Sequence, residues 1–148
     1  MRVVGDTGPL VAAANRRDRA HELAANLVTL LGRDLLVTTP VIVETDQLLR
    51  ARVSAAAARA FLAAMAAGVH TPAPTTAGLL RRAVEIDARF AALDLGFVDA
   101  SVMALAERTD LPILTFDFED FGATSPAVGF WRLVVDEGRY REAVGHGP

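Results

Sequence analysis

The sequence contains no lysine, because all fifteen of its basic residues are arginine. Several catalytic chemistries require a primary amine. Walker-type nucleotide sites, Schiff-base enzymes and phosphoaspartate enzymes with an essential lysine are therefore disfavoured.

Cysteine is also absent, which excludes disulfides, thiolate metal sites and cysteine nucleophiles. The sequence has no run of about eighteen apolar residues of the kind that spans a bilayer. Its start lacks the charged, apolar and small-residue segments of a signal peptide. We therefore expect a cytoplasmic protein with no membrane partner.

The composition predicts one domain. The chain has 148 residues, 52% of them apolar, which is enough for one well-packed core and too little for two ordinary domains. Its formal net charge is −3, so the overall charge gives no indication of a nucleic-acid partner.

Apolar runs alternate with segments of helical periodicity along the chain. We predict strands at 2–5, 35–38 and 113–115, a brief edge strand within 69–74, and a final strand at 129–135. We predict helices from about 9, over 21–31, 40–52 and 55–67, and over 76–92 and 98–107. Thr39 is the predicted cap of the third helix, and Ser54 that of the fourth.

Strands separated by helices predict an α/β fold with a mainly parallel central sheet and helices on both faces. We expect residues 1–135 to form this domain. Residues 136–148 are expected to be a C-terminal tail, frayed after Val135.

Four acids lie where such a fold binds ligands, beyond the carboxyl ends of the strands. Asp6 ends the first strand, and Asp117 follows the strand at 113–115. Glu44 and Asp99 lie in the early turns of predicted helices. Topology can bring all four acids to one edge of the sheet.

Each acid also has an ordinary structural explanation. Asp6 and Asp99 could cap helices, and Asp117 could begin a turn in the acidic stretch TFDFEDF. Glu44 shares a helical face with Val41 rather than with Asp46, and it lies too far into the helix to form a capping box. Its remaining structural explanation is a favourable interaction with the helix dipole.

The expected clustering of these four acids favours a metal site. Four clustered carboxylates with no lysine nearby would repel one another unless a divalent cation compensates them. Oxygen ligands without histidine or cysteine indicate Mg²⁺, with Mn²⁺ as a second possibility. Such sites serve metal-assisted phosphodiester hydrolysis.

Four segments together resemble the PIN-domain ribonucleases, in particular the VapC toxins of bacterial type II toxin–antitoxin systems. VVGDTGPLVA is similar to the opening strand and first acid of that family, and PVIVETDQLL to its Glu-bearing helix. DLGFVDASVMALAE and ILTFDFEDF are similar to its third and fourth acidic segments. The resemblance covers about residues 2–135.

The resemblance implies a set of site residues, which are the metal-binding and catalytic acids Asp6, Glu44, Asp99 and Asp117, with Thr7 and Thr115 as polar supports and Asp94 and Asp120 as less central positions. We expect Asp94 and Asp120 to be structural or peripheral more often than essential. The resemblance also implies a homodimer and a cognate VapB-like antitoxin.

The sequence therefore predicts a magnesium-dependent endoribonuclease toxin that hydrolyses RNA, either tRNA or rRNA, with a metal-activated water. Two alternatives stay open at this point. One is a non-catalytic α/β protein that binds a partner through its alanine-rich helices. The other is a metal-dependent DNA nuclease or phosphatase that uses the same acids.

Overall fold

The computed structural model describes residues 1–145, which are built around a short parallel sheet. Its strands are β1 (Val3–Gly5), β2 (Leu35–Thr38), β3 (Thr71–Ala73) and β4 (Ile113–Leu114). They lie in the order β3-β2-β1-β4, and every pair is parallel. The carboxyl ends of all four strands therefore point to the same edge of the sheet.

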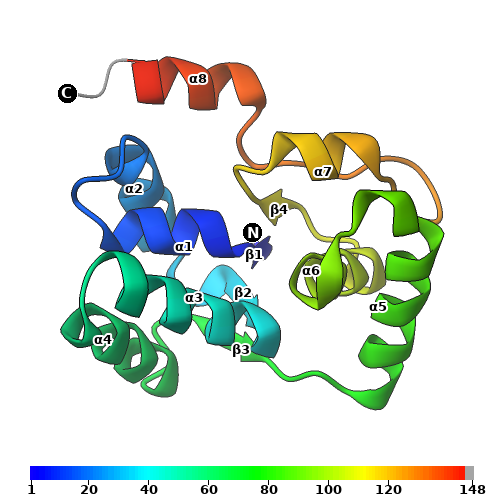
Figure 1. The fold of residues 1–148 in the computed structure, drawn as a ribbon, viewed down its shortest axis with the longest axis horizontal. Coiled ribbons are helices and arrows are strands. Elements are labelled where there is room, and N and C mark those ends of the chain that lie inside the picture. Colours follow the sequence, from blue (N-terminus) through cyan, green and yellow to red (C-terminus); the bar gives the residue numbers. More distant parts are fainter. Residues whose placement is uncertain (146–148) are drawn as a thin grey trace.

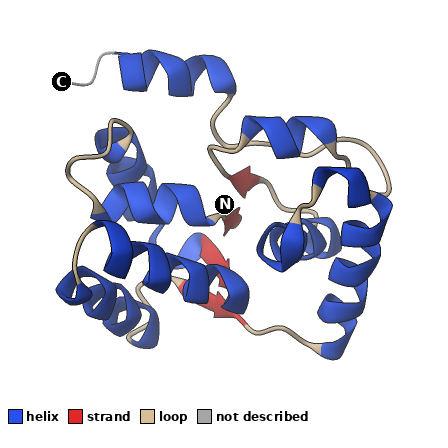
Figure 2. Ribbon diagram, viewed as in Figure 1, coloured by secondary structure: helices blue, strands red, loops and turns tan. Residues whose placement is uncertain are grey.

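Helices connect the strands and cover both faces of the sheet, so the predicted α/β architecture is confirmed (Figures 1 and 2). In Figure 1, α1, α2 and α4 lie on the left of the strands, α3 extends across the view of β2, and α5 and α6 lie on the right. Their bounds are α1 (Thr7–Ala14), α2 (His21–Leu31), α3 (Thr39–Arg52), α4 (Ala55–Ala66), α5 (Ala77–Arg89), α6 (Gly96–Thr109), α7 (Phe118–Ala123) and α8 (Glu137–Gly145), with short 3₁₀ turns at Gly32–Asp34 and Ala91–Leu93.

The two central strands form the middle of the core. Every residue of β1 and β2 is buried, as expected for parallel strands that are covered on both faces. Helix α6 is the most deeply buried helix, with seven consecutive buried residues from Ala100 to Ala106. Asp99 directly precedes this run, so the buried helix fixes the position of that acid.

Hydroxyl side chains cap α3, α4 and α5. Ser54 caps α4 and Thr76 caps α5, each accepting a hydrogen bond from the backbone N–H three residues later. The cap of α3 is Thr38 rather than the predicted Thr39, and its hydroxyl accepts from Val41 N at 3.4 Å. Thr38 has the extended backbone of a cap, whereas Thr39 already has helical geometry.

Two predictions at the C-terminal end are wrong. The final strand predicted at 129–135 is reduced to one bridge between Leu133 and Ile113, and the chain bends on both sides of it, at 127–129 and at 134–135. The segment after Val135 was expected to fray, but Glu137–Gly145 forms α8. Tyr140 attaches this helix by packing on the rings of Phe116 and Phe118, at centroid distances of 4.7 and 5.4 Å. Residues 146–148 of the predicted tail lie outside the described residues.

None of the helices within residues 1–145 combines the length and the apolar character needed to cross a bilayer.

Gly5, the last residue of β1, leaves no room for a side chain. An added Cβ would lie 2.9 Å from Cδ1 and 3.2 Å from Cγ of Leu35, which is fully buried. We expect Gly5→Ala to lower the free energy of unfolding by about 1–3 kcal/mol, because Leu35 has no free space to move into. Urea denaturation measures this loss.

Gly8 provides the matched control, since an added Cβ there meets no atom within 4 Å. Gly8 lies in the first turn of α1, where alanine restricts the unfolded chain more than glycine does. Gly8→Ala should therefore leave stability unchanged or raise it by about 0.4–1 kcal/mol. Equal losses in both variants would contradict the packing argument.

Candidate metal centre

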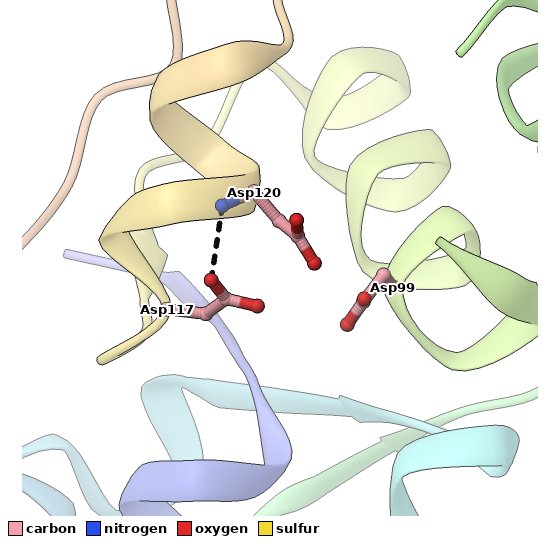
Figure 3. A group of neighbouring side chains, drawn as sticks. All are labelled: Asp99, Asp117 and Asp120. Atoms are coloured by element: carbon pink, nitrogen blue, oxygen red, sulfur yellow. Dashed lines mark hydrogen bonds between the residues drawn. The ribbon is translucent and has the colours of Figure 1, made fainter. Parts of the chain in front are cut away.

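Three aspartates meet at the carboxyl-end edge of the sheet. Asp99, Asp117 and Asp120 each offer one carboxylate oxygen, and these three oxygens all lie within 4.8 Å of one another. Figure 3 shows the three side chains pointing into the space between α6 and α7. Each residue is half-buried, so the carboxylates are held by the fold and remain open to solvent.

A buried hydrogen bond fixes the helix that carries Asp99. The hydroxyls of Thr38 and Ser101 lie 2.9 Å apart, and both residues are fully buried. Thr38 ends β2, and Ser101 lies two residues after Asp99 on α6. This bond therefore ties the Asp99 segment to the carboxyl end of a central strand.

Thr115 connects two of the predicted acids. Its hydroxyl donates to Asp6 Oδ2 at 2.7 Å and accepts from the backbone N–H of Asp117 at 3.0 Å. The backbone N–H of Asp6 also donates to the carbonyl of Leu114, at 2.9 Å. The ends of β1 and β4 are thus joined directly beside the carboxylate cluster.

Asp117 both caps a helix and contributes to the cluster. Its Oδ1 accepts from the backbone N–H of Asp120 at 3.0 Å, which begins α7 (Figure 3). This bond brings Asp117 and Asp120 to the same side of the first turn. A side chain that caps a short helix can therefore also serve as a metal ligand.

Asp6 lies beside the cluster as a buried carboxylate, only 6% exposed. Its Oδ1 accepts from Thr7 N at 2.8 Å at the start of α1. Burial raises the pKa of Asp6 to about 6, although the hydrogen bonds from Thr115 and Thr7 act in the opposite direction. The charges of Asp117 and Glu44 raise this pKa further.

The cluster carries negative charge that the chain does not neutralise. Burial, followed by the charges of Asp6 and Asp117, raises the pKa of Asp99 to about 7. Burial and the charge of Asp117 also raise the pKa of Asp120. Among residues 1–145, no arginine forms an ion pair with any of these acids.

Glu107, outside the cluster, is a carboxylate whose charge is balanced by an arginine. Arg82 donates two hydrogen bonds to it, at 2.6 and 3.0 Å, and these bonds lower the pKa of Glu107. The clustered acids, unlike Glu107, have no arginine partner among the described residues. Burial is the main cause of their raised pKa values, and the charges of the neighbouring carboxylates add to it.

The other predicted site residues lie around the cluster at different depths. Glu44 is half-buried on α3 and outside the three-aspartate group, but its charge raises the pKa of both Asp6 and Asp99. Thr7 is buried, and its hydroxyl has no hydrogen-bond partner among the described residues. Asp94 is exposed in a left-handed turn before α6 and is not part of the group.

These features fit a divalent cation. Hard carboxylate oxygens from Asp99, Asp117 and Asp120 are the donors that Mg²⁺ and Mn²⁺ prefer. A cation would supply positive charge among these carboxylates.

Asp120 was expected to be peripheral, yet the structure brings it into the cluster. The sequence contained a signal for this position: residues three apart share a face of a helix, and Asp120 lies three residues after Asp117. The general acidity of TFDFEDF obscured that spacing, because Glu119 between them is exposed.

Comparison with solved structures gives a match to VapC20 of Mycobacterium tuberculosis, described as a toxin that cleaves the sarcin–ricin loop. The two chains are 26% identical, with a TM-score of 0.75 over 85% of this chain and 98% of that one. Comparison with curated protein sequences gave no significant match. The sequence model of the PIN domain matches residues 3–124, which include all of the acids described above. The protein therefore belongs to the PIN domain family.

Proposed function

We propose that this protein is a magnesium-dependent endoribonuclease and the toxin of a toxin–antitoxin pair. The observation that carries the proposal is the group of three carboxylates with uncompensated charge at the strand-end edge of a PIN fold. The likeness to VapC20, over nearly the whole of that chain, supports an RNA substrate.

Asp99, Asp117 and Asp120 would hold the metal ion in this proposal. A bound Mg²⁺ lowers the pKa of coordinated water and stabilises charge on a phosphate, which is the chemistry needed for phosphodiester hydrolysis. In the overall reaction, a water oxygen forms a bond to phosphorus and the bond to one ribose oxygen breaks. The reaction requires no covalent enzyme intermediate.

The surrounding residues position these acids. The Thr115 hydroxyl accepts a hydrogen bond from the backbone N–H of Asp117 and donates one to the carboxylate of Asp6. Asp6 and Glu44 add negative charge beside the cluster, which strengthens its preference for a cation. A chain with a net charge of −3 can bind RNA in this arrangement because the metal supplies positive charge at the site.

The proposed partners follow from the same likeness. We infer a VapB-like antitoxin that blocks the acidic site, and a guanidinium group is the chemistry that would best neutralise it. We also infer a homodimer. Exposed Leu80 and Val84, four residues apart on α5, form an apolar stripe of the kind that dimer interfaces cover.

Cleavage assays with and without a chelator test the proposed activity. Purified protein should cut RNA in Mg²⁺ or Mn²⁺, and EDTA should abolish the cleavage. Suitable RNAs are a sarcin–ricin-loop hairpin and total tRNA, and duplex DNA, single-stranded DNA and a phosphate monoester serve as comparison substrates.

The outcomes separate the proposed function from its alternatives. Undiminished cleavage in EDTA would overturn the metal-dependent mechanism. Activity on DNA or the monoester, with none on RNA, would indicate a different phosphoesterase. Inactivity on every substrate would favour a partner-binding protein.

A further inference from the structure

A mostly apolar pocket of about 450 Å³ opens next to the acidic site. It lies between α3, the segment before α5, and the start of α6. Its lining residues are Thr39, Pro40, Val43, Glu44, Gln47, Thr75, Phe97 and Val98. The pocket and the acidic site share a helix, because the lining residues Phe97 and Val98 directly precede Asp99 on α6.

Two large apolar side chains of this pocket are left uncovered. Phe97 is 45% exposed and Val43 is 50% exposed. Phe97 lies on α6 only two residues before Asp99, so the aromatic ring and the metal-binding acid are carried by the same helical turn. An aromatic side chain in this position offers a surface on which a flat group can stack.

The polar groups of the pocket suit a neutral ligand. Thr39 and Gln47 are exposed and offer a hydroxyl and an amide, and the buried hydroxyl of Thr75 has no partner among the described residues. Glu44 is the one ionisable residue in the lining, so the pocket repels a phosphate group.

We propose that this pocket binds an unpaired nucleobase of the RNA substrate, stacked on Phe97, next to the phosphate that is cleaved. The proposal rests on the proposed ribonuclease function and adds a base-binding subsite to it. Proteins that recognise RNA commonly take unpaired bases onto aromatic side chains and read their edges with hydrogen-bonding groups. Continuity with the acids along α6, where Phe97 and Val98 directly precede Asp99, favours a nucleotide of the substrate over a side chain of a protein partner as the occupant.

Steady-state cleavage of the RNA hairpin by Phe97 variants tests the subsite. Loss of one stacked base typically weakens binding by about 5- to 150-fold. We therefore expect Phe97→Ala to raise KM within that range, with a smaller effect on kcat. Phe97→Trp should retain a KM near that of the wild type, whereas Phe97→Leu should behave like the alanine variant, because leucine is apolar but cannot stack as a ring.

Phe130→Ala is the matched control. Phe130 is also an exposed phenylalanine, but it does not line the pocket. Its variant should cleave with an unchanged KM. Thermal melts should show all four variants folded, since Phe97 is partly exposed and Phe130 is 88% exposed.

An altered substrate makes the test independent of protein folding. A series of RNAs is made, each with one abasic nucleotide at a different position beside the mapped cleavage site. At one of these positions, loss of the base should raise the KM of the wild type. Phe97→Ala should no longer distinguish that abasic RNA from the intact one, as expected for two groups in contact.

Three outcomes would count against the subsite. An unchanged KM for Phe97→Ala would overturn it, whether or not that variant also loses a bound protein partner. Equal kinetics for the leucine and tryptophan variants would remove the stacking argument. If each abasic RNA changes KM by the same factor for the wild type and for Phe97→Ala, the stacking argument is also contradicted. If the wild type cleaves no RNA, the proposed function itself has failed.

Discussion

Asp99→Asn is expected to reduce RNA cleavage by at least about 100-fold. Substitution of residues that only support metal ligands costs about 10- to 100-fold, and Asp99 is proposed to be a ligand itself. Asparagine keeps the size of the side chain but removes the charge that attracts the cation. The measurement is the single-turnover cleavage rate of the RNA hairpin at saturating Mg²⁺.

Asp117→Asn and Asp120→Asn should fall in the same range, because their carboxylates share the site with Asp99. Glu119→Gln is the closest control, since Glu119 lies between these two residues on the exposed side of α7. Asp46→Asn is a second control, on the helix that carries Glu44, where Asp46 pairs with Arg50 at 3.0 Å.

Both control variants should cleave at the wild-type rate. A loss in Glu119→Gln as large as that in Asp120→Asn would show that the reaction responds to the total charge of the segment rather than to the three clustered carboxylates.

Removal of metal is expected to make the stability of the protein depend strongly on pH. The pKa of Asp99 is about 7 and that of Asp6 about 6, both above the ordinary value of 3.8. Between pH 4 and 7 the folded protein therefore binds more protons at these groups than the unfolded chain does. The free energy of unfolding in EDTA should then fall as the pH rises through this window.

The expected size is taken as only part of the two shifts, because Asp99 is partly open to solvent, which screens its charge. One pKa unit corresponds to about 1.4 kcal/mol, so a single unit at each of the two groups gives about 3 kcal/mol between pH 4 and 7. The raised pKa of Asp120 adds to this effect, and the lowered pKa of Glu107 acts in the opposite direction. The informative quantity is therefore the difference between wild type and Asp99→Asn, measured by urea denaturation at each pH.

Magnesium should reverse the loss in the wild type. A ligand at 100 times its Kd adds about 2.7 kcal/mol to the stability of the folded state. Asp99→Asn should be more stable than the wild type in EDTA at pH 7.5 and should gain little from Mg²⁺. Identical pH profiles for the two proteins in EDTA would contradict the charge-repulsion account of the site.

The sequence leaves Asp6 as either a helix cap or a metal-site residue, and the structure makes it the cap of α1 beside the carboxylate cluster. It accepts a hydrogen bond from Thr7 N at the start of α1, and it also lies among acids whose charges raise its pKa. The strand-to-helix position that favours a capping aspartate is also the position that a parallel sheet brings to its ligand-binding edge.

The sequence alone determined the class of fold and most of the element boundaries. The helix at 21–31 and the strand at 35–38 lie as predicted, and the edge strand β3 lies within the predicted segment. These elements follow local rules, since their apolar spacing, caps and prolines act within a few residues of one another. The final strand was wrong because an apolar run such as GFWRLVV is also compatible with a turn and a single bridge.

The region of the acidic site could likewise be selected from the sequence, because a parallel sheet brings its carboxyl ends to one edge whatever the details of packing. Of the four acids predicted there, Asp99 and Asp117 belong to the three-aspartate group, whereas Asp6 and Glu44 lie outside it. Which oxygens meet there was decided only by the tertiary structure. Asp99, Asp117 and Asp120 converge because the Thr38–Ser101 and Thr115–Asp6 bonds join segments 63 and 109 residues apart. The orientation of α6 against α7 in turn fixes how closely those carboxylates approach. Sequence spacing specifies which residues share one helix or strand, whereas ångström-scale distances between separate elements depend on side chains packed across the whole core.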